Sequence, residues 1–273
     1  MTTFSENPRL TLLIPQYRTL ELTKLCLRLI RKNLDLARIR VVVIDNDSGD
    51  ASLDYLRQVP WIRLIERKAI PGERPPEAHT RALDLALAET DTEFVMSLHT
   101  DTFFLDDGAL KLLLDPFADP QVAGVGSWKL EYVPPWKFAG KYLENLFRDY
   151  IAAPFRGRRV GELHEKIRDH WFLRSHCAVY RTGLLKELRL SFGDGDTAGK
   201  VMHKKLADAG YRLIFLPSET LMPHLLHLDH ATMILNPETG GHRTAKPAAR
   251  RNLEKALAKM HWRDILAEPM DDC

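Results

Sequence analysis

The sequence predicts an α/β fold with a mixed, mainly parallel central sheet flanked by helices. Short apolar runs alternate with segments of helical periodicity over roughly the first hundred residues. A strand–helix–strand order of this kind places the two strands side by side and parallel. Polar side chains directly follow several of the apolar runs. Because ligands bind at the carboxyl ends of the strands in open α/β sheets, a binding site is expected there.

The composition is that of a globular protein with no strong charge bias. The chain has 273 residues, 45% of them hydrophobic, and a formal net charge of +2. This charge gives no reason to expect a nucleic-acid partner. Cys26, Cys177 and Cys273 have neither paired nor metal-type spacing, which favours a reducing compartment. Residues 1–8 are polar, and no apolar run approaches the roughly 20 residues of a membrane span. We therefore expect a cytoplasmic protein.

The first half of the chain is expected to contain four strands separated by helices. The strands are short runs rich in Leu, Ile and Val, at residues 10–14, 40–44, 61–65 and 94–98. The helices carry Leu or Ala at helical spacing, at residues 19–33, 53–56 and 78–88. Residues 71–76 are expected to form a loop broken by Pro and Gly. Residues 9–105 are therefore expected to be a nucleotide-binding half.

The second half is less regular. Strands are expected at residues 122–128, 178–180 and 211–216, and helices at residues 182–188, 200–209 and 248–257. Residues 131–168 mix aromatic and basic side chains and are expected to line a cleft. We divide the chain into one domain of residues 1–235, whose part 106–235 is the acceptor-binding and catalytic half, and a basic, helical extension of residues 236–273.

Polar side chains gather at four points. They are Pro15, Tyr17 and Arg18 after the first strand, Asp45, Asn46 and Asp47 after the second, His99, Thr100 and Asp101 after the strand at 94–98, and the turn from Asp194 to Asp196. In this order and spacing, about residues 9–232 resemble the family 2 glycosyltransferases of the GT-A fold. The resemblance implies an inverting enzyme of the hexosyltransferase class, as in polysaccharide biosynthesis. Such an enzyme moves a sugar from a nucleoside-diphosphate donor, most often of the UDP type, to a hydroxyl of a glycan or lipid-linked acceptor.

The resemblance also implies which residues hold the donor. Pro15, Tyr17 and Asp45 would contact uracil or a similar base, where a carboxylate accepting from a ring N–H gives directional readout. His79 and Arg81 would reach the ribose and the diphosphate from the helix before the central strand. The complete donor set consists of Pro15, Tyr17, Arg18, Asp45, Asp47, His79, Arg81, His99, Thr100 and Asp101.

A divalent cation is implied by the same resemblance. The family's Asp-x-Asp motif falls on residues 99–101, with His99 in place of the first aspartate. Such a cation offsets the charge of the departing diphosphate. An imidazole in place of a carboxylate favours Mn²⁺ over Mg²⁺ beside Asp101. The family also brings a late histidine to the metal, and the candidates are His227 first, then His224 and His230.

An inverting transfer needs a carboxylate that removes the proton of the acceptor hydroxyl. The family places this base near the N-terminus of a helix after a Gly-containing turn, which corresponds here to Asp196 or Asp194. Asp196 also fits an N-cap of a helix that starts at Thr197, so base and cap remain alternatives. The segment from Trp171 to Cys177 resembles the acceptor side of the family. Because aromatic faces stack on sugar rings, the acceptor candidates are Trp171, Trp136 and His176.

The basic tail has two interpretations. Residues 243–263 carry Lys and Arg among Leu253, Leu257 and Met260. Such a segment is suited to an anionic surface at the inner face of a membrane, where a lipid-linked acceptor would lie. A solvated helix packed on the domain is the alternative.

Four other functions remain to be compared with the transferase. A degenerate member of the same fold would bind nucleotide sugars or work without metal, with His99 meeting the diphosphate. A metal-dependent hydrolase would use the histidines with Asp101 and Asp229, and it would leave Asp45 without a role. A basic binding module is disfavoured by the near-neutral charge. A sugar nucleotidylyltransferase is disfavoured because no Gly-rich loop follows the first strand.

Overall fold

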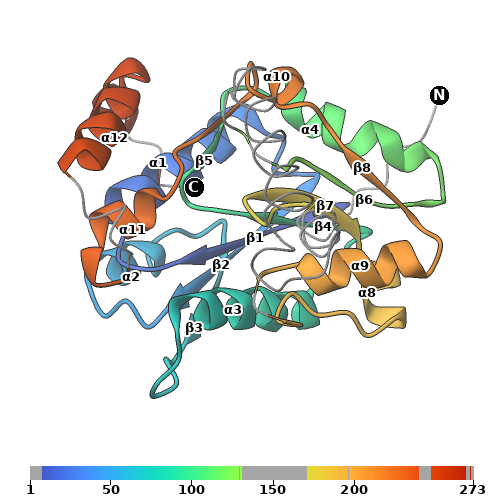
Figure 1. The fold of residues 1–273 in the computed structure, drawn as a ribbon. Helices are drawn as coiled ribbons and strands as arrows, with labels where there is room; N and C mark the ends of the chain where they lie inside the picture. The colour runs from blue at the N-terminus through green and yellow to red at the C-terminus, as the bar shows by residue number, and fades with distance from the viewer. Residues whose placement is uncertain are drawn as a thin grey trace, which may run out of the picture.

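The centre of the molecule is a seven-stranded sheet of strand order β3-β2-β1-β4-β7-β6-β8 (Figure 1). This computed structural model describes residues 8–128, 130, 171–195, 197–239, 247–268 and 271. The strands are β1 (Leu10–Gln16), β2 (Ile39–Asn46), β3 (Arg63–Arg67), β4 (Phe94–Leu98), β6 (Val122–Gly126), β7 (Cys177–Arg181) and β8 (Arg212–Phe215). Strand β7 is antiparallel to both its neighbours, and all the other pairs are parallel. The predicted mixed, mainly parallel sheet is confirmed.

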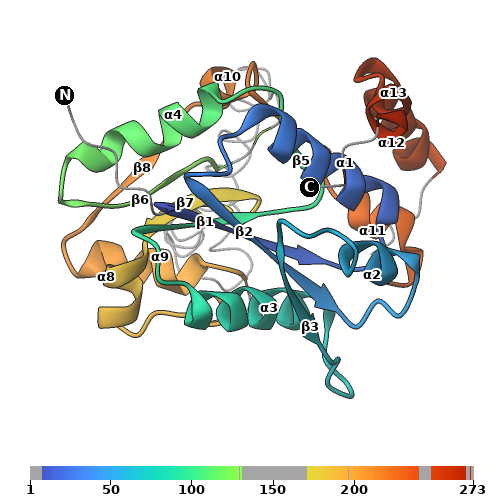
Figure 2. The same ribbon diagram turned by 180° about the vertical axis from the view of Figure 1, so that it is seen from behind.

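Helices cover both faces of this sheet because successive side chains of a strand point to opposite sides. Leu12 and Ile14 of β1 belong to one buried cluster, and Leu13 belongs to the other. The first cluster includes residues of α1 (Leu20–Asn33), α2 (Ala51–Leu56) and α4 (Gly108–Leu114). The second includes residues of α3 (Pro75–Glu89), α8 (Thr182–Glu187) and α9 (Lys200–Asp208). Figures 1 and 2 show these two layers above and below the sheet.

A second, two-stranded sheet lies beyond the end of β4. It pairs β5 (Thr102–Phe104) with β9 (Leu225–His227) in antiparallel register, with Thr102 opposite His227. The short helix α10 (Ser218–Leu221) precedes β9, and α11 (Ala231–Leu235) follows it. This pairing brings a segment from late in the chain to the carboxyl end of β4.

The C-terminal segment packs on α1. It contains α12 (Pro247–Lys259) and α13 (Trp262–Ala267) (Figure 2). Leu253 and Leu257 are buried in the same cluster as the residues of α1. The buried Arg28 of α1 donates from Nε and Nη2 to the carboxylate of Asp271 at 3.1 and 2.5 Å. In the part of the chain that the structure describes, no helix is both long and apolar enough to cross a bilayer.

Two expected boundaries differ from the structure. Helix α3 begins at Pro75, inside the expected loop, because proline is tolerated in a first helical turn that lacks intrahelical N–H partners. Strand β3 begins at Arg63, because its pairing with β2 starts there.

Helix α9 begins at Lys200, where it was expected, and its N-cap is Gly199 at φ 75°. The alternative of a helix that starts at Thr197 with Asp196 as its cap is therefore wrong. Residue 196 itself and residues 131–168, with Trp136 among them, lie outside the described residues.

Candidate functional site

A cavity of about 740 Å³ lies at the carboxyl ends of β1, β2 and β4. Its wall continues along the loop before α3, the segment before β7, residues 197–198 and the turn between β9 and α11. This volume is within the range of pockets that hold small-molecule ligands. The cavity therefore has the position and the size that the strand ends predict.

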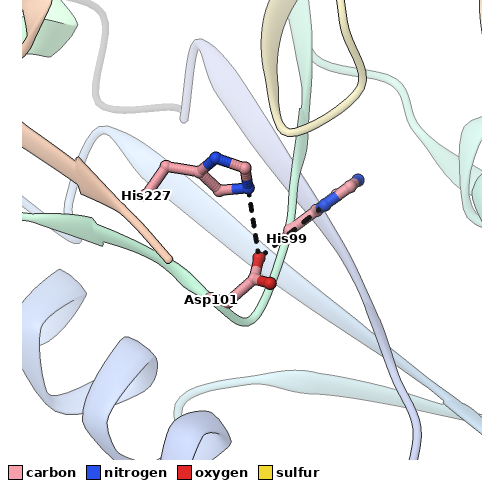
Figure 3. A group of neighbouring side chains, drawn as sticks. All are labelled: His99, Asp101 and His227. Carbon is pink, nitrogen blue, oxygen red and sulfur yellow. Dashed lines mark ion pairs between the residues drawn. The ribbon is translucent and has the colours of Figure 1, made fainter. Parts of the chain in front are cut away.

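Three side chains in its wall form a group suited to a metal ion. The groups are His99, Asp101 and His227, and each offers one ligand atom within 4.8 Å of the others (Figure 3). Asp101 Oδ1 lies 3.8 Å from His99 Nδ1 and 3.6 Å from His227 Nε2. His99 follows β4 directly, and a turn in which Thr102 N donates to the carbonyl of His99 carries the chain past Asp101 into β5. The β5–β9 register then places His227 beside this turn.

The carboxylate of Asp101 is buried and incompletely satisfied. Its Oδ2 accepts a hydrogen bond from the backbone N–H of Ala231 at 3.1 Å. Its Oδ1 is buried and has no hydrogen-bond partner. Burial raises the pKa of Asp101 above its ordinary value. An unpartnered buried oxygen is costly, and a cation held between it and the two imidazoles would satisfy it. The group therefore fits a divalent cation, and two nitrogens with one oxygen suit Mn²⁺ better than Mg²⁺.

The imidazoles of His79 and His99 are held neutral. Burial lowers the pKa of His79 to about 4. Burial also holds the pKa of His99 well below its ordinary value, and the neighbouring His79 and His227 add to this effect. His176 stacks on His227 with ring centroids 4.6 Å apart. A neutral imidazole keeps a free nitrogen lone pair, so His99 is in the form that binds metals.

The nucleotide side of the cavity differs from the sequence prediction at one position. Pro15 and Tyr17 lie in the cavity wall as expected, but Asp45 does not. The buried carboxylate of Asp45 accepts from Gln16 Nε2 at 2.9 Å and from the backbone N–H of Ser48 at 3.0 Å. Burial raises the pKa of Asp45. Asn46 lies in the wall instead, 9% exposed, and its Oδ1 is buried without a hydrogen-bond partner. Asn46 lines the cavity in place of Asp45 because successive side chains of a strand, here residues 45 and 46 of β2, point to opposite sides.

The structure separates the remaining predicted residues into two sets. His79, Thr100, His176 and His230 lie in the cavity wall together with the group of Figure 3. The other set lies outside the wall: Arg18 contacts Ser48, Asp47 pairs with Lys68, Asp194 pairs with Lys205, and His224 pairs with Asp106, whereas Arg81 and Trp171 contact the wall residues Glu73 and Trp128. His224 is therefore not a member of the group formed by His99, Asp101 and His227, and Asp194 does not line the cavity.

The sequence did not single out Arg174, which lies in the cavity wall. Its guanidinium carbon is 4.2 Å from the ring centre of Trp128 and 4.3 Å from that of Phe172. Burial lowers the pKa of Arg174, although a guanidinium remains charged. Arg28 and Arg67, the more buried arginines, each pair with a carboxylate, whereas Arg174 has no such partner among the described residues. Cation–π contacts with these two rings keep the positively charged guanidinium of Arg174 in the cavity wall, where an anionic ligand would neutralise its charge.

Comparisons with known proteins agree with this architecture. The family model described as Glycosyl transferase family 2 matches residues 11–189. The mannosyltransferase PcManGT from Pyrobaculum calidifontis, solved with GDP-Man and Mn²⁺, has a TM-score of 0.54 and 20% identity, covering 79% of this chain and 56% of that one.

TarS from S. aureus is similar in fold as well. Its residues 1–349 give a TM-score of 0.50 at 16% identity, covering 77% of this chain and 58% of that one. The complex with UDP-GlcNAc gives a TM-score of 0.50 at 19% identity, covering 77% of this chain and 56% of that one. The chain thus spans a little over half the length of these solved structures. No curated protein matches it. The likenesses show a GT-A fold.

Proposed function

The chain belongs to glycosyl transferase family 2, and from this premise we propose that it is an inverting glycosyltransferase. It moves a sugar from a nucleoside-diphosphate donor, of the UDP type, to a hydroxyl of a glycan or glycolipid. One observation carries the proposal more than any other. The buried carboxylate oxygen of Asp101 lacks a hydrogen-bond partner and faces the imidazoles of His99 and His227 in the wall of a cavity of nucleotide size.

The nucleoside would occupy the part of the cavity between Pro15, Tyr17 and Asn46. The amide of Asn46 offers one acceptor and one donor. Uracil presents an N3–H donor beside the O4 acceptor, which is the complementary pair. Guanine presents the same pair in its O6 acceptor and N1–H donor, but its N2 amino donor would then lack a partner, and a carboxylate would satisfy N1–H and N2 together. This match supports a UDP-type donor.

The diphosphate would lie over His99, Asp101 and His227. A divalent cation held by these residues supplies positive charge against the diphosphate as it leaves. One carboxylate and two neutral imidazoles leave a bound divalent cation with a net charge of +1, whereas two carboxylates would leave none. The guanidinium of Arg174 in the same wall adds a second positive charge. These charges favour an anionic ligand in this part of the cavity.

The proposed base is Asp196. Its chain neighbour Thr197 and Ala198 lie in the cavity wall, whereas Asp194 pairs with Lys205. Asp229, which also lies in the cavity wall, is the alternative carboxylate. Trp128 and His176 would border the acceptor on the same side.

A thermal-shift series with UDP, GDP and their sugars, each with and without Mn²⁺, tests the proposal. A true donor binds only the native state and raises the melting temperature by mass action. We expect the largest rise for UDP with Mn²⁺ and no cation-dependent rise in His99→Ala. A chain unaffected by every nucleotide would contradict the proposal.

A metal-dependent hydrolase would use the same three groups. Asp45 no longer separates the two functions, since its carboxylate has an internal structural role. The hydrolase predicts release of free sugar or phosphate without an acceptor. The transferase predicts product formation only when an acceptor hydroxyl is supplied.

A further inference from the structure

The hydroxyl of Ser175 lies between two imidazoles of the cavity wall. Its Oγ is 3.1 Å from His99 Nε2 and 3.4 Å from His79 Nε2. The two rings meet edge to face, with centroids 4.9 Å apart and an interplanar angle of 83°. His99, Ser175 and His79 therefore form a continuous hydrogen-bonded relay. It starts at His99, which together with Asp101 and His227 makes up the group suited to a metal ion, here called the cation group.

Three different elements hold this relay in place. His79 lies on α3, and His99 follows the last residue of β4. Ser175 precedes β7, whose antiparallel register with β4 places Leu98 opposite Cys177. The backbone N–H of His99 also donates to the carbonyl of His176 at 3.4 Å. The position of Ser175 beside His99 thus follows from sheet pairing rather than from a flexible loop.

The direction of the hydrogen bonds follows from the cation site. His99 Nδ1 faces Asp101 Oδ1 at 3.8 Å, and it can bind a cation only if it carries no proton. A neutral imidazole must then carry its proton on Nε2, which donates to Ser175 Oγ. The hydroxyl proton of Ser175 in turn points to His79 Nε2. The opposite direction would place a proton on His99 Nδ1, against the cation.

We propose that Ser175 and His79 are positioning residues for the cation site, because they fix the tautomer and the orientation of His99. This inference rests on the proposed function and deepens it. An aspartate has no tautomer to select, so a histidine in its place needs such a partner. The inference also gives His79 a new role, as support for a cation ligand instead of a contact to the ribose and diphosphate.

The structure contains a matched control. Ser127 Oγ lies 3.0 Å from His176 Nε2, which is the same kind of serine–histidine contact near the same cavity. His176 does not belong to the cation group. Removing the hydroxyl of Ser127 therefore perturbs an imidazole that stacks on His227 but offers no ligand atom, and it leaves the hydrogen bonds between His99, Ser175 and His79 in place.

Calorimetric titration of the full chain with Mn²⁺ alone tests the inference. We expect Ser175→Ala to weaken binding about 10- to 100-fold, the usual effect of losing such a partner, and Ser127→Ala to leave it nearly unchanged. Ser175→Thr keeps the hydroxyl and should restore affinity. His79→Gln keeps an acceptor and should bind Mn²⁺ better than His79→Leu. Bound Co²⁺ gives a visible spectrum that reports loss of an ordered nitrogen ligand in Ser175→Ala, and thermal melts without metal show whether each variant is folded.

Each outcome decides between distinct conclusions. Equal Mn²⁺ affinity in Ser175→Ala and Ser127→Ala, with loss of binding in His99→Ala, would overturn the positioning role alone. A wild-type chain that binds UDP but no Mn²⁺ would overturn both the cation and its positioning residues, and would leave a metal-independent transferase. A lower melting temperature in Ser175→Ala with unchanged Mn²⁺ affinity would show that Ser175 is merely structural.

Discussion

The two ends of the cavity hold their polar groups in different ways. At the end proposed for the nucleoside, near Pro15, Tyr17 and Asn46, the carboxylates of Asp45 and Glu73 have partners. The carboxylate of Asp45 accepts from Gln16 and Ser48, and the buried Glu73 pairs with Arg67 and Arg81. At the end proposed for the cation, near His99, Asp101 and His227, the Oδ1 of Asp101 has no hydrogen-bond partner. The guanidinium of Arg174 contacts aromatic rings there and pairs with no carboxylate among the described residues.

This difference indicates how each end would recognise its part of the donor. Neutral amide groups such as Asn46 discriminate by the pattern of donors and acceptors, and each hydrogen bond contributes modestly. Charged groups without an opposite charge nearby, such as Asp101 and Arg174, interact strongly with a cation or an anion that binds in the cavity. Substitutions at the cation end should therefore lower turnover, and substitutions at the nucleotide end should change the preferred base.

The largest effect is expected from Asp101→Asn. An amide is a weak cation ligand, so kcat should fall about 1000-fold or more, the scale of several kcal/mol of transition-state charge stabilisation. Titration with Mn²⁺ should show no binding. The amide oxygen of the variant can still accept the hydrogen bond from the backbone N–H of Ala231. Activity at the wild-type level would remove Asp101 from the site.

The same variant should not be less stable without metal. Burial raises the pKa of Asp101 in the folded state, so the stability that its protonated form contributes is present at acidic pH and lost as pH rises through this pKa. Near pH 7 the charged carboxylate therefore destabilises the metal-free protein, and Asn removes that charge. Melting curves at pH 5 and pH 8 should show a gain that is larger at pH 8. A marked loss of stability at both values would mean that Asp101 is mainly structural.

The next effect separates the two carboxylates predicted as base. Asp196→Asn should lower kcat roughly 100- to 1000-fold, within the range for loss of a general base, with little change in donor affinity. Asp194→Asn should change kcat little, because Asp194 pairs with Lys205 outside the cavity wall. Initial rates with a fixed acceptor measure both. The reverse order would assign the base to Asp194, and full activity in both would transfer the role to Asp229.

Arg174 and Arg81 form a second matched pair. Arg174→Gln should lower kcat/KM roughly 10- to 100-fold, the scale of one charge-assisted hydrogen bond, because the variant removes a guanidinium of the wall that has no carboxylate partner among the described residues. Arg81→Gln should have little effect, since Arg81 lies outside the wall and already pairs with Glu73. Arg174→Lys keeps the charge but loses the planar contact with Trp128 and should fall in between. Equal effects at both positions would contradict the assignment.

Much of this site could be predicted because strand ends are visible in the sequence. The run from Phe94 to Leu98 indicates where β4 ends, and the side chains after it must lie near those after β1 and β2. The pattern could not indicate which of two adjacent side chains faces the cavity. At Asp45 and Asn46 the answer depends on the phase of the strand pleat, which the sequence does not specify when both residues are polar.

Long-range pairing explains the residues that the sequence could not place. His224, His227 and His230 recur at intervals of three, and only the β5–β9 register selects His227 as the one beside Asp101. Arg174 and Ser175 gain their roles from neighbours distant in the chain, Trp128 and His99. No local pattern around Arg174 distinguishes it from a surface arginine, because its contact with Trp128 forms only when β7 pairs between β4 and β6.

The smallest effect, and the one most specific to the nucleotide end, is expected from Asn46→Asp. A carboxylate offers no donor to uracil O4 but accepts both N1–H and the N2 amino group of guanine. The Kd for UDP should therefore rise about 10-fold and the Kd for GDP should fall, while turnover with a saturating donor changes little. Asn46→Ala is the control, because it removes both hydrogen bonds and should weaken both nucleotides without exchanging their order. If Asn46→Asp leaves the ratio of the two Kd values unchanged, other residues recognise the nucleobase. Asn46 would then not be the neutral group that selects the nucleotide, and the contrast between the two ends of the cavity would no longer hold.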